Sequence, residues 1–338
     1  MNVLITGAAG YIGSICSEVL LDRGISVIAL DNLQEGHRAA VPENAVFCHA
    51  DLAVRAQIED VFSKHKIDAV MHFAGEALVA KSVREPSTFY AANVACGINL
   101  LDAMVRHGVK KLIFSSTAAT YGEPEIVPIP EDHRQAPINP YGKSKLVFEQ
   151  ILADYRAYTG LDYVTLRYFN AAGASALRGE AHRVETHLIP KILDAAAGII
   201  PHVDVMGTDY ATLDGTCVRD YIHVLDIADS HVRALEEIAK VGGEAFNVGN
   251  SRGFSILEVL AAAEKVTGKT ISRKLTSRRP GDPAVLVASK EKLKRALGWE
   301  AQHSSLQEIV SSAWAWKQKN PRGYQTSDSV TAAAIPEK

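Results

Sequence analysis

Short runs of apolar residues recur along the first 170 positions of the chain, separated by longer stretches with the periodicity of amphipathic helices. Within each run the apolar residues are consecutive rather than alternating, which is typical of strands buried on both faces of a parallel sheet. The pattern predicts strands at 3–5, 26–30, 45–50, 69–73, 111–114 and 163–167, and helices at 12–23, 55–64, 86–107 and 141–158. Strands that alternate with helices in this way predict an α/β fold, a doubly wound parallel Rossmann sheet.

The pattern changes after Asn170. Residues 171–218 are richer in Gly, His and Pro and lack a clear period, as expected of loops that shape a cleft. A strand and a helix expected within 219–245 should return to the first sheet. We therefore expect a Rossmann domain from 1–170 with 219–245, a smaller α/β substrate-binding domain from 171–218 and 246–318, and a loosely ordered tail at 319–338.

Composition and charge narrow the class of protein. The chain has 338 residues, 47% of them hydrophobic and 22% charged, which indicates a globular protein. Its formal net charge is −3 and it has no long run of Lys or Arg, which argues against nucleic acid or an anionic membrane surface as a partner. The cysteines Cys16, Cys48, Cys96 and Cys217 are widely spaced, which favours reduced thiols over a disulfide framework. With neither a signal peptide nor a membrane-spanning apolar stretch apparent, we expect a cytoplasmic protein.

A glycine-rich loop follows the first predicted strand and opens the first predicted helix, with the sequence Gly7-Ala8-Ala9-Gly10-Tyr11-Ile12-Gly13. Glycines at this spacing let the backbone approach a pyrophosphate, to which the helix N-terminus presents free N–H groups. Asp31 ends the second strand, where a carboxylate accepts hydrogen bonds from the adenosine ribose and repels a 2′-phosphate. The sequence therefore favours NAD over NADP. Asp51, at the end of the third strand, fits a turn residue as well as it fits a ligand of the adenine amino group.

Tyr141 and Lys145 are four residues apart and therefore share one face of a predicted helix. A phenol is a poor base at neutral pH, because its usual pKa is about 10. A neighbouring ammonium and a positively charged nicotinamide both favour the phenolate, which would lower that pKa and make Tyr141 a general base. Thr117 ends a strand at the carboxyl edge of the sheet and can place its hydroxyl between Tyr141 and a substrate. These three side chains are the candidate catalytic residues.

Several sequence blocks, taken together, resemble the extended short-chain dehydrogenase/reductases. The blocks are 7–13, Asp31-Asn32-Leu33, His72-Phe73-Ala74-Gly75, Phe114-Ser115-Ser116-Thr117, 141–145 and Arg167-Tyr168-Phe169-Asn170. Two later blocks, 214–224 and Arg278-Arg279-Pro280-Gly281-Asp282-Pro283, are more specific and resemble the members of that family that interconvert UDP-glucose and UDP-galactose. The resemblance covers about residues 1–318 in register.

The resemblance implies a tightly held NAD that is not consumed, and reversible epimerisation at C4 of a UDP-sugar with Tyr141 as the base. It implies an NAD site formed by Gly7, Gly10, Tyr11, Ile12, Gly13, Asp31, Asn32, Asp51, Leu52, Phe73, Ala74, Gly75, Asn93, Tyr141, Lys145 and Tyr168. It implies a UDP-sugar site formed by Thr117, Tyr141, Asn170, His187, Arg219, Tyr221, Arg279 and Asp282. Independently of the resemblance, an Arg guanidinium fork suits diphosphate oxygens.

Alternative activities stay open to different degrees. A related 4-epimerase of N-acetylated UDP-sugars is undecided, because Leu286 has an intermediate size at a position that, by the resemblance, gates these substrates. An enzyme acting on UDP-glucuronate would need a further cation, which we do not identify. A dehydratase is disfavoured because Ala118 and Ala119 cannot transfer protons. A catalytically inactive NAD-sensing protein is disfavoured because Tyr141 and Lys145 are both present.

Two further expectations concern assembly and metals. The predicted helix at 86–107 carries apolar side chains on more than one side, and 146–158 is similar, whereas one sheet covers only one stripe of each helix. We therefore expect a homodimer that pairs these helices. His182 and His187 are five residues apart and would lie on different faces of a helix, and no His-Glu-x-x-His sequence occurs. We therefore assign no metal site from the sequence.

Overall fold

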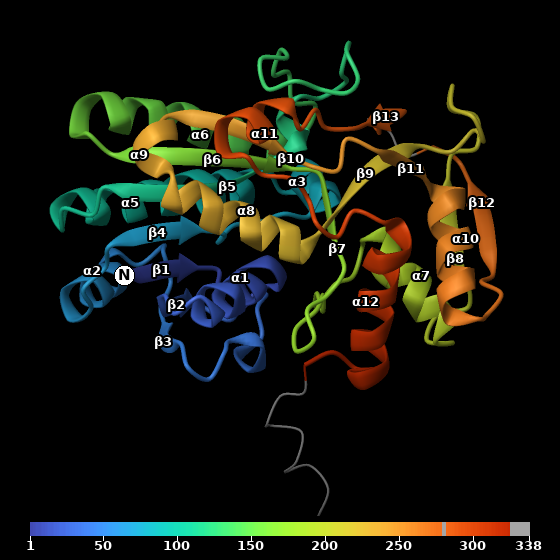
Figure 1. The fold of residues 1–338 in the computed structure, drawn as a ribbon, viewed down its shortest axis with the longest axis horizontal. Coiled ribbons are helices and arrows are strands. Elements are labelled where there is room, and N and C mark those ends of the chain that lie inside the picture. Colours follow the sequence, from blue (N-terminus) through green and yellow to red (C-terminus); the bar gives the residue numbers. More distant parts are fainter. Residues whose placement is uncertain (279–281, 325–338) are drawn as a thin grey trace, which may run out of the picture.

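The computed structural model describes residues 1–278 and 282–324 and has two lobes (Figure 1). The larger lobe is built on a parallel sheet of seven strands in the order β10-β6-β5-β4-β1-β2-β3. These strands are β1 (Asn2–Thr6), β2 (Ser26–Asp31), β3 (Val46–His49), β4 (Ala69–His72), β5 (Lys111–Thr117), β6 (Asp162–Tyr168) and β10 (Glu244–Val248). The doubly wound Rossmann sheet predicted from the sequence is thus confirmed.

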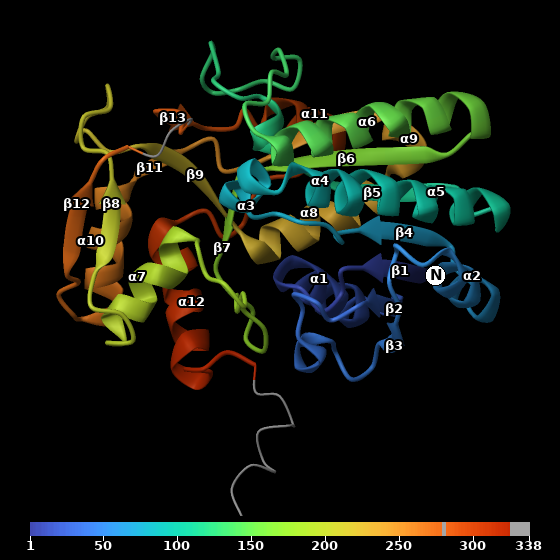
Figure 2. The ribbon, with the colours of Figure 1, turned by 180° about the vertical axis from the view of Figure 1, so that it is seen from behind.

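Helices cover both faces of this sheet because its strands are apolar on both faces. Val3 and Ile5 point into one core, which α1 (Tyr11–Asp22) and α8 (Val224–Glu236) cover. Leu4 points into the other core. That face is covered by α2 (Arg55–Lys64), α5 (Cys96–Arg106) and α6 (Pro140–Thr159), and Figure 2 shows α5 and α6 in front of the sheet. Shorter helices complete the lobe: η1 (Arg38–Ala40), α3 (Val79–Arg84), η3 (Ala118–Thr120), α9 (Ile238–Val241) and α11 (Glu291–Leu297).

The strand order reverses at the neighbours β1 and β4, where Thr6 and His72 are paired in register. In a doubly wound sheet the crossovers on either side of such a point run to opposite faces, so a crevice opens beyond the carboxyl ends of the strands. The predicted glycine loop follows β1, and Phe73, Ala74 and Gly75 follow β4. The fold therefore brings two of the predicted cofactor-binding segments to the same edge.

The predicted helix at 86–107 is present with one irregularity. It consists of α4 (Pro86–Tyr90), a π-helical turn η2 (Ala91–Ala95) and α5. The whole segment Pro86–Arg106 is long and apolar enough to cross a membrane by length and composition alone, but such a test also selects the core helices of globular proteins. Here α5 packs against α2 and α6 and contributes Leu100, Leu101 and Met104 to the core beneath the sheet. We therefore interpret it as a core helix with an uncovered side.

The smaller lobe has its own apolar core. Its helices α7 (Leu188–Ala196), α10 (Ile256–Thr267) and α12 (Leu306–Lys319) contact one another. Two small sheets lie beside them. One pairs β8 (Val203–Met206) with β12 (Arg273–Thr276), and the other joins β7 (Asn170–Ala172), β9 (Val218–His223), β11 (Gly253–Ser255) and β13 (Val285–Leu286).

The arrangement differs from expectation in the segment 219–245. Its helix α8 packs on the large sheet, but its strand β9 pairs with β7, β11 and β13 instead. Asp220 fastens β9 to these neighbours, because its carboxylate accepts hydrogen bonds from the backbone N–H of Asn250 and Ser251, between β10 and β11, and of Ala288, after β13. The seventh strand of the large sheet is β10, which overlaps the segment expected in the substrate domain.

The predicted loosely ordered tail begins with residues that are bound to the body of the protein. Gly179 N donates to the Tyr324 hydroxyl at 3.1 Å, and the Tyr324 hydroxyl lies 3.2 Å from Gly179 O. The Tyr324 ring also lies 5.5 Å from the His37 ring, centroid to centroid. The remainder of the predicted tail, 325–338, lies outside the described residues.

Candidate active site

The glycine loop closes tightly against its neighbours. Gly7 has a φ of 73°, and a Cβ there would lie 2.6 Å from Ala74 N. A Cβ on Gly13 would lie 2.2 Å from Gly7 O. Gly10 is the N-cap of α1 and, among the described residues, no side chain caps the first turn. The backbone N–H groups at the start of α1 are therefore available to an anionic ligand.

The predicted adenosine-binding residues gather at the ends of β2 and β3. Asp31 Oδ2 accepts a hydrogen bond from Ala9 N at 2.9 Å, and Oδ1 accepts one from Leu33 N at 2.8 Å. Burial raises the pKa of Asp31, and the two backbone hydrogen bonds oppose that shift. Asn32 Nδ2 donates to Asp51 Oδ2 at 3.1 Å, so these two side chains are in direct contact. Leu52 is buried beside them.

The three predicted catalytic side chains meet at the ends of β5 and α6. Asn139 caps α6 by accepting a hydrogen bond from Gly142 N at 2.9 Å, which places Tyr141 in the first turn. The side chain of Thr117, the last residue of β5, is hydrogen-bonded to the side chain of Tyr141. One helical turn further on, Lys145 Nζ donates to the Ser115 carbonyl at 3.0 Å.

Burial dominates the electrostatics of this group. It lowers the pKa of Lys145 to about 8, against the opposing charge of Glu149. It raises the pKa of Tyr141, against the opposing hydrogen bond from Thr117. The expected lowering of the Tyr141 pKa by Lys145 is therefore not found in the chain by itself, because desolvation of a phenolate costs more than the neighbouring groups recover.

The π-helical turn η2 places Asn93 beside Lys145. Asn93 Oδ1 accepts from Glu76 N at 2.8 Å, and its Nδ2 donates to Ser144 Oγ at 2.9 Å. A Cβ on Gly75, whose φ is 156°, would lie 2.6 Å from Asn93 Oδ1 and 3.6 Å from Lys145 Nζ. The predicted cofactor residues Gly75 and Asn93 thus surround the predicted catalytic lysine.

Three of the predicted substrate residues, Asn170, Arg219 and Tyr221, lie on the small sheet. Asn170 on β7 is in register with Tyr221 on β9. Arg219, two residues before Tyr221 on β9, forms an ion pair with Asp282. The side chains of Arg219 and Asp282 are 10% and 25% exposed. Predicted partners of a nucleoside diphosphate are therefore already in contact with each other. Arg279 lies outside the described residues, and His187 lies elsewhere, at the N-cap of α7.

Comparison with known proteins assigns the family. Residues 3–249 match the NAD dependent epimerase/dehydratase family. The chain belongs to this family. It is 46% identical over 331 residues to the UDP-glucose 4-epimerase of Halalkalibacterium halodurans, which covers 97% of this chain and 99% of the relative.

Two solved structures of relatives share the whole fold. The UDP-glucose 4-epimerase of Brucella ovis in complex with NAD has a TM-score of 0.90 and 43% identity, over 93% of this chain and 97% of its own. The UDP-glucose 4-epimerase of Bifidobacterium longum in complex with NAD+ and UDP has a TM-score of 0.91 and 39% identity, over 96% of this chain and 100% of its own.

The residues of this epimerase-family chain fit NAD. The buried Lys145 ammonium has three N–H donors, and the described hydrogen bond to Ser115 uses one of them. The glycine loop has no room for side chains at Gly7 and Gly13, as a close approach to a pyrophosphate requires. Tyr11 begins α1, and its hydroxyl donates to Gly173 O at 2.6 Å, with Ile12 packed against the core behind it.

One neighbour of the site was missed from the sequence. His231, on α8, stacks on Phe73 with ring centroids 4.7 Å apart, and its Nε2 lies 3.2 Å from Ser115 Oγ. Ser115 is also hydrogen-bonded to the Tyr168 side chain and accepts from Lys145 through its carbonyl. No motif marks His231, because its place depends on how α8 packs on the sheet, and a helical period alone does not give that.

His182 and His187, to which the sequence assigns no metal, are in contact. Residues 180–187 are not helical, so the argument from helix faces is wrong, and the rings of His182 and His187 lie 4.8 Å apart. Burial alone would lower the pKa of each, but hydrogen bonds with Glu180 and Glu185 raise the pKa of His182 to about 9 and that of His187 to about 10.

Proposed function

We propose that this protein is a UDP-glucose 4-epimerase, which interconverts UDP-glucose and UDP-galactose with bound NAD. The observation that carries the proposal is the contact of Tyr141 with Thr117, one helical turn from a buried Lys145, at the edge where the glycine loop lies. The relatives named above share this activity by name, and one was solved with both NAD+ and UDP. A base beside a dinucleotide site is what reversible oxidation of a sugar alcohol requires.

The chain's own residues would share the proton chemistry. Tyr141 would accept the proton of the sugar 4-hydroxyl when C4 is oxidised, and would return it to the oxygen on C4 when the resulting ketone is reduced from its opposite face. Thr117, already hydrogen-bonded to Tyr141, orients the hydroxyl between the two side chains. Lys145 binds the nicotinamide ribose with its free donors and favours the phenolate by its charge. Bound NAD supplies the hydride acceptor and donor and a positive ring charge.

The substrate would be held across the two lobes. Arg219 suits the diphosphate because a guanidinium binds two oxygens at once, and Asp282 suits the uridine ribose. Tyr221 and Asn170 lie beside each other on β9 and β7, and we assign both to the same nucleotide. His187 and Arg279 complete the proposed set.

The decisive experiment is product analysis. Purified protein, with no NAD added, is incubated separately with UDP-galactose, UDP-N-acetylglucosamine and UDP-glucuronate, and the product sugars are separated. We expect UDP-glucose from the first. Epimerisation of only the second or third substrate would replace the proposed substrate, and no product from any of them would contradict the proposed activity.

We further propose a cytoplasmic homodimer. Its interface would be the uncovered side of α4 and α5, where Tyr90 and Val105 are each 39% exposed and the nearby Val83 is 65% exposed. The four cysteines form no disulfide in the part of the chain that the structure describes, which is consistent with a reducing compartment. Light scattering should give twice the chain mass, and Tyr90→Glu should give the monomer. A monomeric wild-type protein at micromolar concentration would contradict the proposal.

A further inference from the structure

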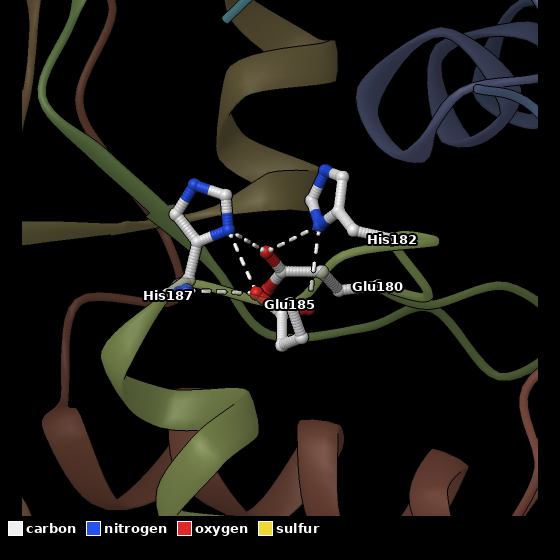
Figure 3. A group of neighbouring side chains, drawn as sticks. All are labelled: Glu180, His182, Glu185 and His187. Carbon is white, nitrogen blue, oxygen red and sulfur yellow. Dashed lines mark hydrogen bonds and ion pairs between the residues drawn. The ribbon is translucent and has the colours of Figure 1, made fainter. Parts of the chain in front are cut away.

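Four metal-ligating side chains converge on one point away from Tyr141, Lys145 and Thr117, and one of the four, His187, also belongs to the proposed substrate set. They are Glu180, His182, Glu185 and His187, which come from one irregular segment that enters α7. One ligand atom from each lies within 4.8 Å of the others. Figure 3 shows the two imidazole rings approaching the carboxylates from opposite sides, each through its Nδ1.

The four N–O contacts in the cluster are slightly shorter than the ligand spacing of a small four-coordinate ion, and the ligand atoms all lie within 4.8 Å of one another. Glu180 Oε1 lies 3.2 Å from His182 Nδ1 and 2.9 Å from His187 Nδ1. Glu185 Oε2 lies 3.3 Å from His182 Nδ1, and its Oε1 lies 3.0 Å from His187 Nδ1. Ligands about 2.0–2.1 Å from a tetrahedral zinc ion are separated by about 3.4 Å, so small movements would admit an ion between them.

We propose that this cluster binds one zinc-class divalent cation through the two Nδ1 atoms and the two carboxylates. Two imidazoles select a borderline-soft cation over Mg²⁺ or Ca²⁺, which prefer oxygen ligands. The cation replaces the protons that the imidazoles share with the carboxylates, and the two negative charges neutralise it. The inference goes beyond the proposed epimerase activity, to which the ion need contribute no chemistry.

Burial gives the cluster the character of a built site. The side chain of Glu180 is 8% exposed and that of Glu185 is 18% exposed, whereas His182 and His187 are 32% and 45% exposed. The carboxylates therefore form the floor, and the rings leave an entry path from solvent. Glu180, His182 and Glu185 also line one wall of a pocket of about 520 Å³ that α7 and α12 border.

The position of the cluster suggests what the ion would hold together. The His182 ring lies 6.4 Å from the ring of Tyr11, the first residue of α1 in the Rossmann lobe, in an edge-on contact. His187 is the N-cap of α7 in the smaller lobe. A cation bound to both histidines would fix the segment between the two lobes beside the proposed cofactor site.

The test measures metal binding directly. Chelator-treated protein with its NAD is titrated with ZnCl₂ by calorimetry, and with Co²⁺ while the visible spectrum is recorded. We expect one ion per chain, a Co²⁺ spectrum of low coordination number, and a higher melting temperature with Zn²⁺. His182→Gln and Glu180→Gln should each weaken Zn²⁺ binding at least about a hundredfold and abolish the thermal shift.

The matched control is His202→Gln, which removes a half-exposed histidine of the smaller lobe that lies outside the cluster, 3.6 Å from Asp204. This variant should bind Zn²⁺ as the wild type does. Circular dichroism and NAD content show which variants are folded. If only one of the two cluster variants folds, that variant alone tests the site. A wild-type protein that binds no stoichiometric Zn²⁺, or cluster variants that bind it as tightly as the wild type, would overturn the site while leaving the epimerase proposal untouched.

Discussion

Arg167 and Glu149 form a buried ion pair directly beneath the proposed catalytic residues, with Arg167 Nη2 2.6 Å from Glu149 Oε2. The two side chains are 7% and 8% exposed. Glu149 also accepts from Ser116 Oγ, next to Thr117, and Arg167 donates to the Tyr121 hydroxyl at 3.0 Å. The pair thus links α6 to the ends of β5 and β6.

Glu149→Gln should destabilise the protein strongly. It keeps the shape but leaves the buried Arg167 charge without its counter-ion, which costs about 3–5 kcal/mol in comparable pairs. Urea unfolding measures the loss of free energy of unfolding. Lys240→Gln, which removes an exposed partner of Glu237, is the matched control and should change stability by less than about 1 kcal/mol. Equal effects of the two variants would show that the buried pair is not a major determinant of stability.

Tyr141→Phe should slow turnover strongly while leaving the cofactor bound. The substitution removes the proposed base, and loss of a general base typically costs about 10²–10⁴-fold in rate. The Tyr141 ring packs edge-on to Phe89 with centroids 6.3 Å apart, a contact that phenylalanine keeps. The measurements are kcat with UDP-galactose and the NAD content of the purified variant. A variant with wild-type kcat would assign the proton transfer to another group.

Gly13→Ala should prevent NAD binding, whereas Gly10→Ala should weaken it only moderately. A Cβ on Gly13 would lie 2.2 Å from Gly7 O, so the loop must move, but a Cβ on Gly10 would lie 3.3 Å from the same atom. The two variants carry the same added methyl group in the same loop. Cofactor content after purification and an NAD titration distinguish them. If both bound NAD equally, the tight closure of the loop would not be needed for the cofactor.

The sequence predicts the large sheet well because buried parallel strands are marked by local patterns. Each strand from β1 to β6 appears as an apolar run, and the glycine loop and Tyr141-to-Lys145 spacing fall where the fold needs them. The order of β9 and β10 is not predictable in this way. Both are short strands of mixed polar and apolar residues, and their places depend on partners far away in the chain, such as the loop that bonds to Asp220.

The side-chain contacts that the sequence does not predict have the same cause as the places of β9 and β10. Glu180, His182, Glu185 and His187 meet because an irregular segment folds back on itself, so an argument from helical spacing does not apply. The π-helical turn that aims Asn93 at Gly75 also leaves no clear signal in the residue pattern. Motifs identify which residues carry chemistry, whereas packing decides which of them touch.

His72 should make the protein less stable in acid. Its Nδ1 lies 2.7 Å from Thr6 Oγ1 at the switch point of the sheet, and it is 1% exposed. Burial, with a smaller contribution from the Lys145 charge, lowers the pKa of His72 to about 3, whereas an unfolded histidine has a pKa of about 6.5. Between these values only the unfolded chain binds the proton, so the free energy of unfolding falls as the pH falls through this window.

The effect is isolated by comparing the wild type with His72→Gln, which keeps a hydrogen-bonding group for Thr6 but does not titrate. The difference in their free energies of unfolding should change by about 1.4 kcal/mol per pH unit between about pH 5.5 and 4, in favour of the variant as the pH falls. Urea unfolding at several pH values measures it, with His202→Gln as the control for removing a half-exposed histidine. A difference that stays constant with pH would mean that His72 takes up its proton in the folded protein as readily as in the unfolded chain.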